Sequence, residues 1–157
     1  MNVFLPCLLE RWSSAGGSRT GVRGALNTWQ DVRRDVMRNL EWLLNTEAPA
    51  RLGSRRDIPD AVMDSALCFG IEPYSGRAQS SLTPSEVAWS IRQRILAFEP
   101  RIHRHSLEVH VTDSDGHMRF NKMRFTVVGQ LRADPMPIEF IAQAEIDTDT
   151  GEARVGS

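Results

Sequence analysis

The sequence predicts an α+β domain in which N-terminal helices pack on a C-terminal antiparallel β-meander of three to four strands. Between residues 28 and 98, apolar residues recur at three- and four-residue steps, as on one face of a helix. After residue 102 the period changes to two, and turn-forming residues separate the alternating runs. Helices followed by strands in separate blocks are typical of the α+β class.

Residues 1–24 are expected to form an apolar arm and a Gly/Ser-rich linker, and residues 25–157 the domain. A segment as short as the arm does not form a stable helix alone in water. It therefore folds back onto its own domain or anchors in a partner, and the glycine-rich linker favours the partner. The linker resembles a phosphate-binding loop only superficially, because it lacks the Gly-Lys-Ser/Thr ending and no strand precedes it. Unless the arm docks, its apolar side chains would be exposed to solvent; they are Phe4, Leu5, Leu8, Leu9 and Trp12.

The first predicted helix begins after Thr28, with Asp31 placed as in a capping box, and closes at Asn45-Thr46 before Pro49. Its charged residues alternate in sign and are expected on a solvated, ion-paired face. These charged residues are Asp31, Arg34, Asp35 and Arg38. The expected buried stripe is Val32, Val36, Leu40, Leu43 and Leu44.

A short helix is predicted from Pro59 to about Leu67, ending before Gly70. The next helix has Thr83 as N-cap and Glu86 as its capping-box acid, and Pro100 should end it near Phe98. Its expected buried residues are Val87, Ile91, Ile95 and Phe98. The strands are predicted over residues 107–111, 123–131, 138–146 and 153–155.

Glu99-Pro100-Arg101 places a carboxylate and a guanidinium at the joint between helix and sheet. On extended chain the Glu99 and Arg101 side chains would point the same way. The pair could brace the corner, bind a partner, or take part in acid chemistry. As an exposed brace it would stabilise the fold by less than about 1 kcal/mol, whereas desolvation against a partner would raise its contribution.

Composition gives the chain little reason to bind nucleic acid or an anionic membrane, since its net charge is −1 and its isoelectric point is near 6.4. Lys122 is the only lysine, and the arginine bias fits either a subunit of an assembly or a genome rich in arginine codons. Cys7 and Cys68 match no zinc or redox spacing, which favours reduced thiols in the cytosol. The apolar run over residues 3–9 is a poor signal peptide, because no basic residue precedes it and charged residues follow at once.

No metal or cofactor site is predicted. His103 and His105 would share one side of a strand, yet no thiol or acidic ligand lies at a convincing spacing, and the same holds for His110 and His117. The tryptophans lack the basic groove of a nucleic-acid-stacking platform and are expected in the core or at a helix seam. They are Trp29, Trp42 and Trp89.

Five segments resemble, in order, the lysozyme-like baseplate wedge family of contractile injection machines. The most specific are residues 39–46 (NLEWLLNT) and residues 98–102 (FEPRI). Residues 8–11 and the closing hairpin, residues 146–151, are also similar to that family. In residues 65–71, Cys68-Phe69 stands where the family usually has Asn-Tyr.

The resemblance is strongest to the TssE-like, type VI secretion branch. It implies a non-catalytic structural subunit at the cytoplasmic face of the inner membrane, without a cofactor. The implied partners are the wedge subunits TssF, TssG and TssK and the sheath proteins TssB and TssC, whose strands would pair with the sheet edge. The implied partner-binding residues are Glu99, Pro100 and Arg101 of the corner and Leu8, Leu9, Arg11 and Trp12 of the arm.

Two alternatives stay open. One is a peptidoglycan-cleaving muramidase, which requires a second carboxylate facing Glu99 across a cleft. Arg101 opposes that role because a neighbouring cation favours an ionised carboxylate, and a chain without an export signal does not reach peptidoglycan. The other is a stand-alone protein-binding adaptor with the same fold.

Overall fold

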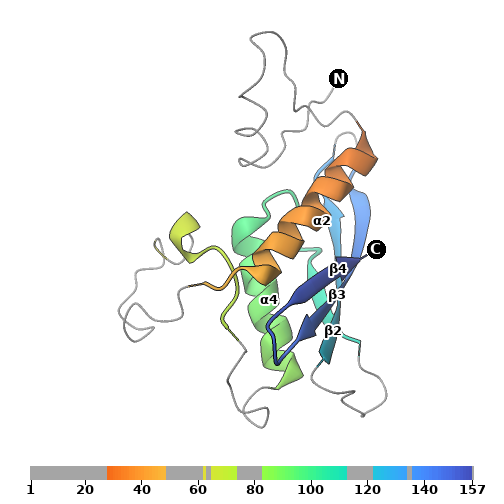
Figure 1. The fold of residues 1–157 in the computed structure, drawn as a ribbon. Coiled ribbons are helices and arrows are strands. Elements are labelled where there is room, and N and C mark those ends of the chain that lie inside the picture. The colour runs from red at the N-terminus through yellow and green to blue at the C-terminus, as the bar shows by residue number, and fades with distance from the viewer. Residues whose placement is uncertain are drawn as a thin grey trace.

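The computed structural model describes residues 28–48, 62, 65–73, 83–112, 122–133 and 136–156. It confirms the α+β class: helices precede an antiparallel sheet, and α2 and α4 lie on one face of it (Figure 1). The predicted arm and linker lie outside the described residues. The elements are α2 (Trp29–Asn45), the 3₁₀ turn η1 (Ala66–Cys68), α4 (Pro84–Phe98), β1 (Glu108–Val111), β2 (Lys122–Leu131), β3 (Ile138–Asp147) and β4 (Ala153–Gly156).

Helix α2 begins as predicted. The Asp31 N–H donates to Thr28 Oγ1 at 3.2 Å, and the Thr28 N–H donates to Asp31 Oδ2 at 3.2 Å, which completes a capping box. The helix ends at Asn45, with Thr46 as C-cap. The predicted stripe is confirmed, since Val32, Val36, Leu40, Leu43 and Leu44 are all buried.

Helix α4 also has the predicted bounds, from Pro84 to Phe98. Three of the four expected core residues of this helix are fully buried, and Phe98 is only half-buried. The Phe98 ring lies on the flank of the core, where it meets the Phe69 ring edge-on at 5.3 Å between centroids. Phe69 follows η1. Of the short helix predicted from Pro59 to about Leu67, Val62 is helical, but Ala66–Cys68 form a 3₁₀ turn, and residues 59–61, 63 and 64 lie outside the described residues.

The N-cap of α4 supports a prediction about stability. The Glu86 N–H donates to Thr83 Oγ1 at 3.3 Å, and the same hydroxyl donates to Glu86 Oε2 at 2.7 Å. Thr83→Ala should lower the free energy of unfolding by about 1 kcal/mol in urea titration, because an exposed helix end loses its hydroxyl cap. Thr83→Ser keeps the hydroxyl and should unfold like the wild type. Equal losses in both variants would contradict this role for the cap.

The four strands form a meander in the order β1-β2-β3-β4. In its central pair, Phe125 lies opposite Ala144 and Val127 opposite Ala142. These side chains are buried under the helices, while Arg124 and Glu145 of the same strands point to the uncovered face. The alternation read from the sequence is thus confirmed, and the core lies between this sheet and the two helices.

A second connection joins the end of α2 to the segment after η1. The Ile71 N–H donates to the Thr46 carbonyl at 2.9 Å, and the Ala48 N–H donates to the Ile71 carbonyl at 2.8 Å. Gly70 lies beside this contact with φ +118°, a backbone conformation that favours glycine. The chain that leaves α2 is therefore tied to a segment more than 20 residues further along.

Candidate functional site

The corner after α4 is a turn stabilised by its own backbone. The Glu99 N–H donates to the Ile95 carbonyl at 2.8 Å, and the Ile102 N–H donates to the Glu99 carbonyl at 3.2 Å. Pro100 occupies the second position of this turn, where its fixed φ is favoured. The expectation that Glu99 and Arg101 lie on extended chain is therefore wrong, because the chain must reverse for Ile102 to pair with Leu131 of β2.

The predicted meeting of Glu99 and Arg101 occurs nevertheless. Arg101 Nε donates to Glu99 Oε1 at 2.7 Å and Nη2 donates to Oε2 at 2.7 Å, which is bidentate geometry. The Arg101 backbone N–H (3.2 Å) and Asn39 Nδ2 (2.9 Å) donate to the same carboxylate. Glu99 is only 1% exposed, so the pair is a buried one rather than an exposed brace.

Asp35 is the unexpected member of this cluster. Its Oδ2 accepts from Arg101 Nη1 and its Oδ1 accepts from Arg38 Nη2. Asp35 is 2% exposed, which corrects the expectation that it lies on a solvated face of α2. Asp35 is buried because the Glu99–Arg101 corner, which is distant in sequence, packs over this part of α2. A sequence signal did exist: Asp35 and Asn39 are four residues apart and therefore share one side of the helix.

Asp35, Arg38, Glu99 and Arg101, which we call the corner cluster, balance two negative charges with two positive ones. Burial by itself lowers the pKa of Arg101, but the bonds to Glu99 and then to Asp35 outweigh it and raise the pKa above its ordinary value. Arg101 therefore stays charged at physiological pH. Since each buried carboxylate depends on a cation, removing Arg101 would take the cationic partner from Glu99 and one of the cations from Asp35.

The surface above the corner cluster is formed by its two arginines together with Pro100 and Trp42. Pro100 is exposed, and the Arg101 side chain keeps 20% of its surface accessible. Beside them the Arg38 guanidinium lies over the Trp42 ring, 5.3 Å from its centroid. We call Arg38, Trp42, Pro100 and Arg101 the corner surface. Arginine and tryptophan are enriched at protein–protein interfaces, so the corner surface contains residues that such contacts favour.

The corner does not have the properties of a glycosidase acid. Such an acid needs access to a substrate and a raised pKa. Glu99 lacks the access, because Arg101 and Asn39 cover its oxygens. The arginines of this site neutralise buried carboxylates; they do not prepare one of them for acid catalysis.

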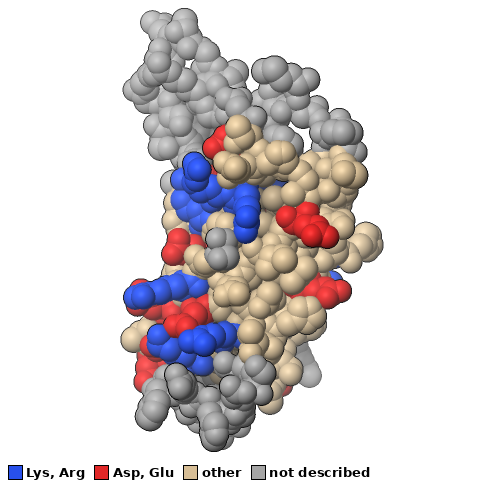
Figure 2. Space-filling view, turned by 90° about the vertical axis from the view of Figure 1, so that its right-hand side faces the viewer, with Lys and Arg blue, Asp and Glu red and all other residues tan. Residues whose placement is uncertain are grey.

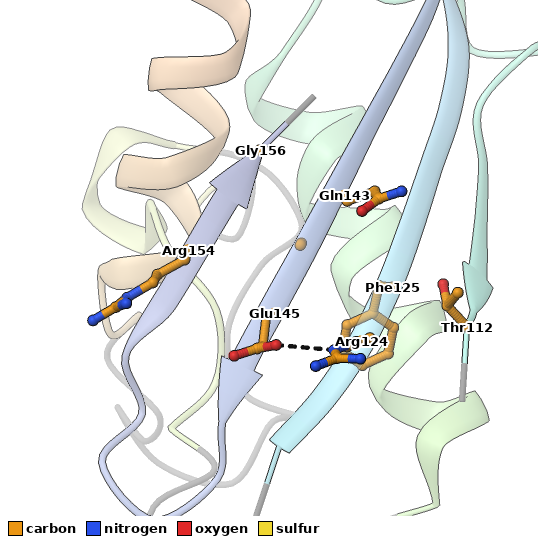
Figure 3. Close-up of a pocket in the computed structure, with 8 residues that line it drawn as sticks. Thr112, Arg124, Phe125, Gln143, Glu145, Arg154 and Gly156 are labelled. Atoms are coloured by element: carbon orange, nitrogen blue, oxygen red, sulfur yellow. Dashed lines mark hydrogen bonds and ion pairs between the residues drawn. The ribbon is translucent and has the colours of Figure 1, made fainter. Parts of the chain in front are cut away.

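A shallow hollow lies on the uncovered face of the sheet, where β2, β3 and β4 run side by side (Figure 3). Its carboxylate, Glu145, accepts from Lys122 at 2.6 Å and from Arg124 at 2.9 Å, and these bonds lower the pKa of Glu145. Glu145 is therefore suited to an ion pair on the surface rather than to proton donation. Figure 2 shows that cationic and anionic side chains alternate along one side of the molecule.

The histidines and tryptophans differ in part from expectation. His103 and His105 lie in the turns after the corner instead of sharing a strand, and His110 pairs with Glu108 at 2.9 Å. Among the residues that the structure describes, no three potential ligands come together as a metal site. His117 lies outside them.

Trp89 is 56% exposed, so its expected place in the core or at a helix seam is wrong.

The baseplate wedge protein gp25 family matches residues 30–136 of this chain. That range contains α2 except its first residue, the corner cluster and the first two strands. The chain belongs to the gp25 baseplate wedge family. No curated protein and no solved structure matches it.

Membership of the baseplate wedge family confirms the resemblance found in the sequence and indicates a structural role among other baseplate components. The arm residues Leu8, Leu9, Arg11 and Trp12 lie outside the part of this wedge protein that the structure describes. Within the described part, none of its helices has the length and apolar character needed to cross a membrane.

Proposed function

We propose that this wedge protein is a non-catalytic structural subunit of a type VI secretion baseplate at the cytoplasmic face of the inner membrane. The observation that carries the proposal is the family match over residues 30–136, which includes the Glu-Pro-Arg corner. Its proposed partners are TssF, TssG and TssK in the wedge and TssB and TssC in the sheath. The arm, through Leu8, Leu9, Arg11 and Trp12, is proposed as a second anchor on the wedge.

The corner surface is the proposed docking site for the wedge core. Pro100 and the outer part of Arg101 would contact the partner, and Glu99 would act from beneath by fixing Arg101. A guanidinium already held by two carboxylates loses little conformational entropy on binding, which favours association. Its neighbour Arg38, stacked on Trp42, would extend the contact along α2.

The docking proposal predicts that Pro100→Asp abolishes co-purification with TssF and TssG. The substitution places a charge on the exposed corner without removing a member of the corner cluster, and aspartate is compatible with a turn. Arg104→Asp is the matched control, because Arg104 is also exposed but lies in the next turn. Both variants should unfold within a few degrees of the wild type, as measured by thermal denaturation.

Retention of TssF and TssG by Pro100→Asp would show that the corner is only an internal brace. Loss of both partners by Arg104→Asp as well would indicate a general effect of charge rather than a defined docking site. A wild-type chain that fails to bind any wedge subunit would refute the assignment to a type VI baseplate and favour the stand-alone adaptor.

A further inference from the structure

Two N–H groups of the Arg101 guanidinium are left over from the corner cluster. An arginine side chain has five N–H donors. Within the described part of the chain, Arg101 uses Nε and one N–H of Nη2 toward Glu99, and one N–H of Nη1 toward Asp35. One N–H on each terminal nitrogen therefore remains for an acceptor from outside, and 20% of the side chain is accessible.

The corner cluster is neutral as a whole but presents positive charge to the outside. Its carboxylates, Asp35 and Glu99, are only 2% and 1% exposed. The side chains of Arg38 and Arg101 are 37% and 20% exposed. Asp31, one turn earlier on this side of α2, is itself ion-paired. A partner that approaches the corner thus meets guanidinium groups, and the charge that complements them is negative.

An apolar surface lies beside these cations, at the C-terminal end of α4. The Phe98 ring, directly before the corner in the chain, meets the Phe69 ring edge-on. Arg94 Nη1 also lies 3.5 Å from the Cys68 carbonyl, so that η1 is held against α4 (Figure 1). Leu67 of η1 is nevertheless 75% exposed. A partner seated on the corner would lie next to this leucine, whose burial would stabilise the contact.

The charges on the uncovered face of the sheet are arranged differently. Glu145 is 29% exposed there, between Lys122 at 48% and Arg124 at 62%. Opposite charges are therefore exposed together, and this face specifies no sign of charge for a partner. The corner surface does specify one, because its anions lie beneath its cations.

We propose that the corner surface and Leu67 together bind a partner segment that is both acidic and apolar, with a carboxylate on the two remaining N–H groups of Arg101 and an apolar side chain against Leu67. The inference rests on the proposed docking of the wedge core and names the chemistry of the segment that docks. Glu99 and Asp35 already fix the guanidinium, so little conformational entropy is lost when the carboxylate binds. The resulting hydrogen bonds are charge-assisted.

Pro100→Arg and Pro100→Asp test the sign of the charge, because they change the same exposed residue in opposite directions. With the full chain co-expressed with TssF and TssG, Pro100→Arg should retain both partners, whereas Pro100→Asp should lower their recovery about tenfold or more. Equal losses would overturn the acidic chemistry and leave docking at the corner in place. Retention by both variants would overturn the inference together with docking at the corner. A wild type that binds neither TssF nor TssG would refute the proposed function itself.

Carbodiimide cross-linking identifies the partner's group, since the reagent joins an amine to a carboxylate. The chain is suited to it because Lys122, on the sheet, is the only lysine. Pro100→Lys adds an amine at the corner, and Arg104→Lys adds one to the next turn as the matched control. In the complex with TssF and TssG, we expect Pro100→Lys to be joined to an aspartate or glutamate of the partner, as located by mass spectrometry. An assembled complex in which Pro100→Lys cross-links no more than Arg104→Lys would overturn the proposal.

Leu67→Ser tests the apolar part of the surface. Because Leu67 is largely exposed, thermal denaturation should be unchanged, while the dissociation constant for TssF–TssG should rise about fivefold. Met136→Ser is the control, since Met136 is 71% exposed and precedes β3. Unchanged binding by Leu67→Ser, or an equal loss in Met136→Ser, would overturn the assignment of η1 to this interface.

Discussion

Arg101→Met should lower the free energy of unfolding by about 3–5 kcal/mol, because it removes the cationic partner of the buried Glu99 and one of the cations that bind the buried Asp35. For a domain of this size the loss corresponds to a fall in Tm of roughly 10 °C. Urea titration and thermal denaturation of the purified variant measure both quantities.

Arg38→Met is the control for this prediction. Arg38 bonds to Asp35 but is 37% exposed, so water can replace part of its contribution and the loss should be clearly smaller. If Arg101→Met unfolds within about 1 kcal/mol of the wild type, the two carboxylates are not effectively desolvated. The corner cluster would then have no structural role of the kind described above.

Gly70→Ala should destabilise the fold by about 2–4 kcal/mol, from backbone strain combined with steric overlap. At φ +118° an alanine Cβ would lie 2.2 Å from the Thr46 carbonyl oxygen and 2.9 Å from the Ala48 nitrogen. Both atoms belong to backbone that bonds to Ile71, so neither can move without breaking those bonds. Urea titration measures the loss, and near-native far-UV circular dichroism at low urea would show that the helices persist.

Gly151→Ala offers the comparison. Gly151 also has positive φ, at +75°, but no atom lies within 4 Å of the position that its Cβ would occupy. Its substitution should therefore cost only the conformational term, about 1 kcal/mol. Equal effects at the two positions would mean that overlap with Thr46 does not contribute.

The corner cluster changes how the Glu-Pro-Arg motif is interpreted. The motif was expected to provide both of its charges to a partner or to brace the corner on the surface. In the structure Glu99 is buried beneath Arg101, and Asp35 and Asn39 of α2 bind the same two side chains. Pro100→Asp therefore tests docking without touching the buried charges, whereas the unfolding of Arg101→Met tests how far those charges stabilise the fold.

Local order in this protein could be read from its sequence. Capping boxes at Thr28 and Thr83, the stop imposed by Pro100 and the period-two runs after residue 102 each act within a few residues. Such signals involve short-range sterics and hydrogen bonds, so one sequence suffices to predict the helix limits and the buried face of each strand. The residues of the corner turn were identified in the same way, although their backbone was not.

Only the tertiary structure decided which distant residues meet. Asp35 and Arg101 are 66 positions apart, and Asn45 reaches Ala153 across 108 positions. The spacing of Asp35 and Asn39 puts both on one side of α2, but the burial of Asp35 depends on where the chain places the corner.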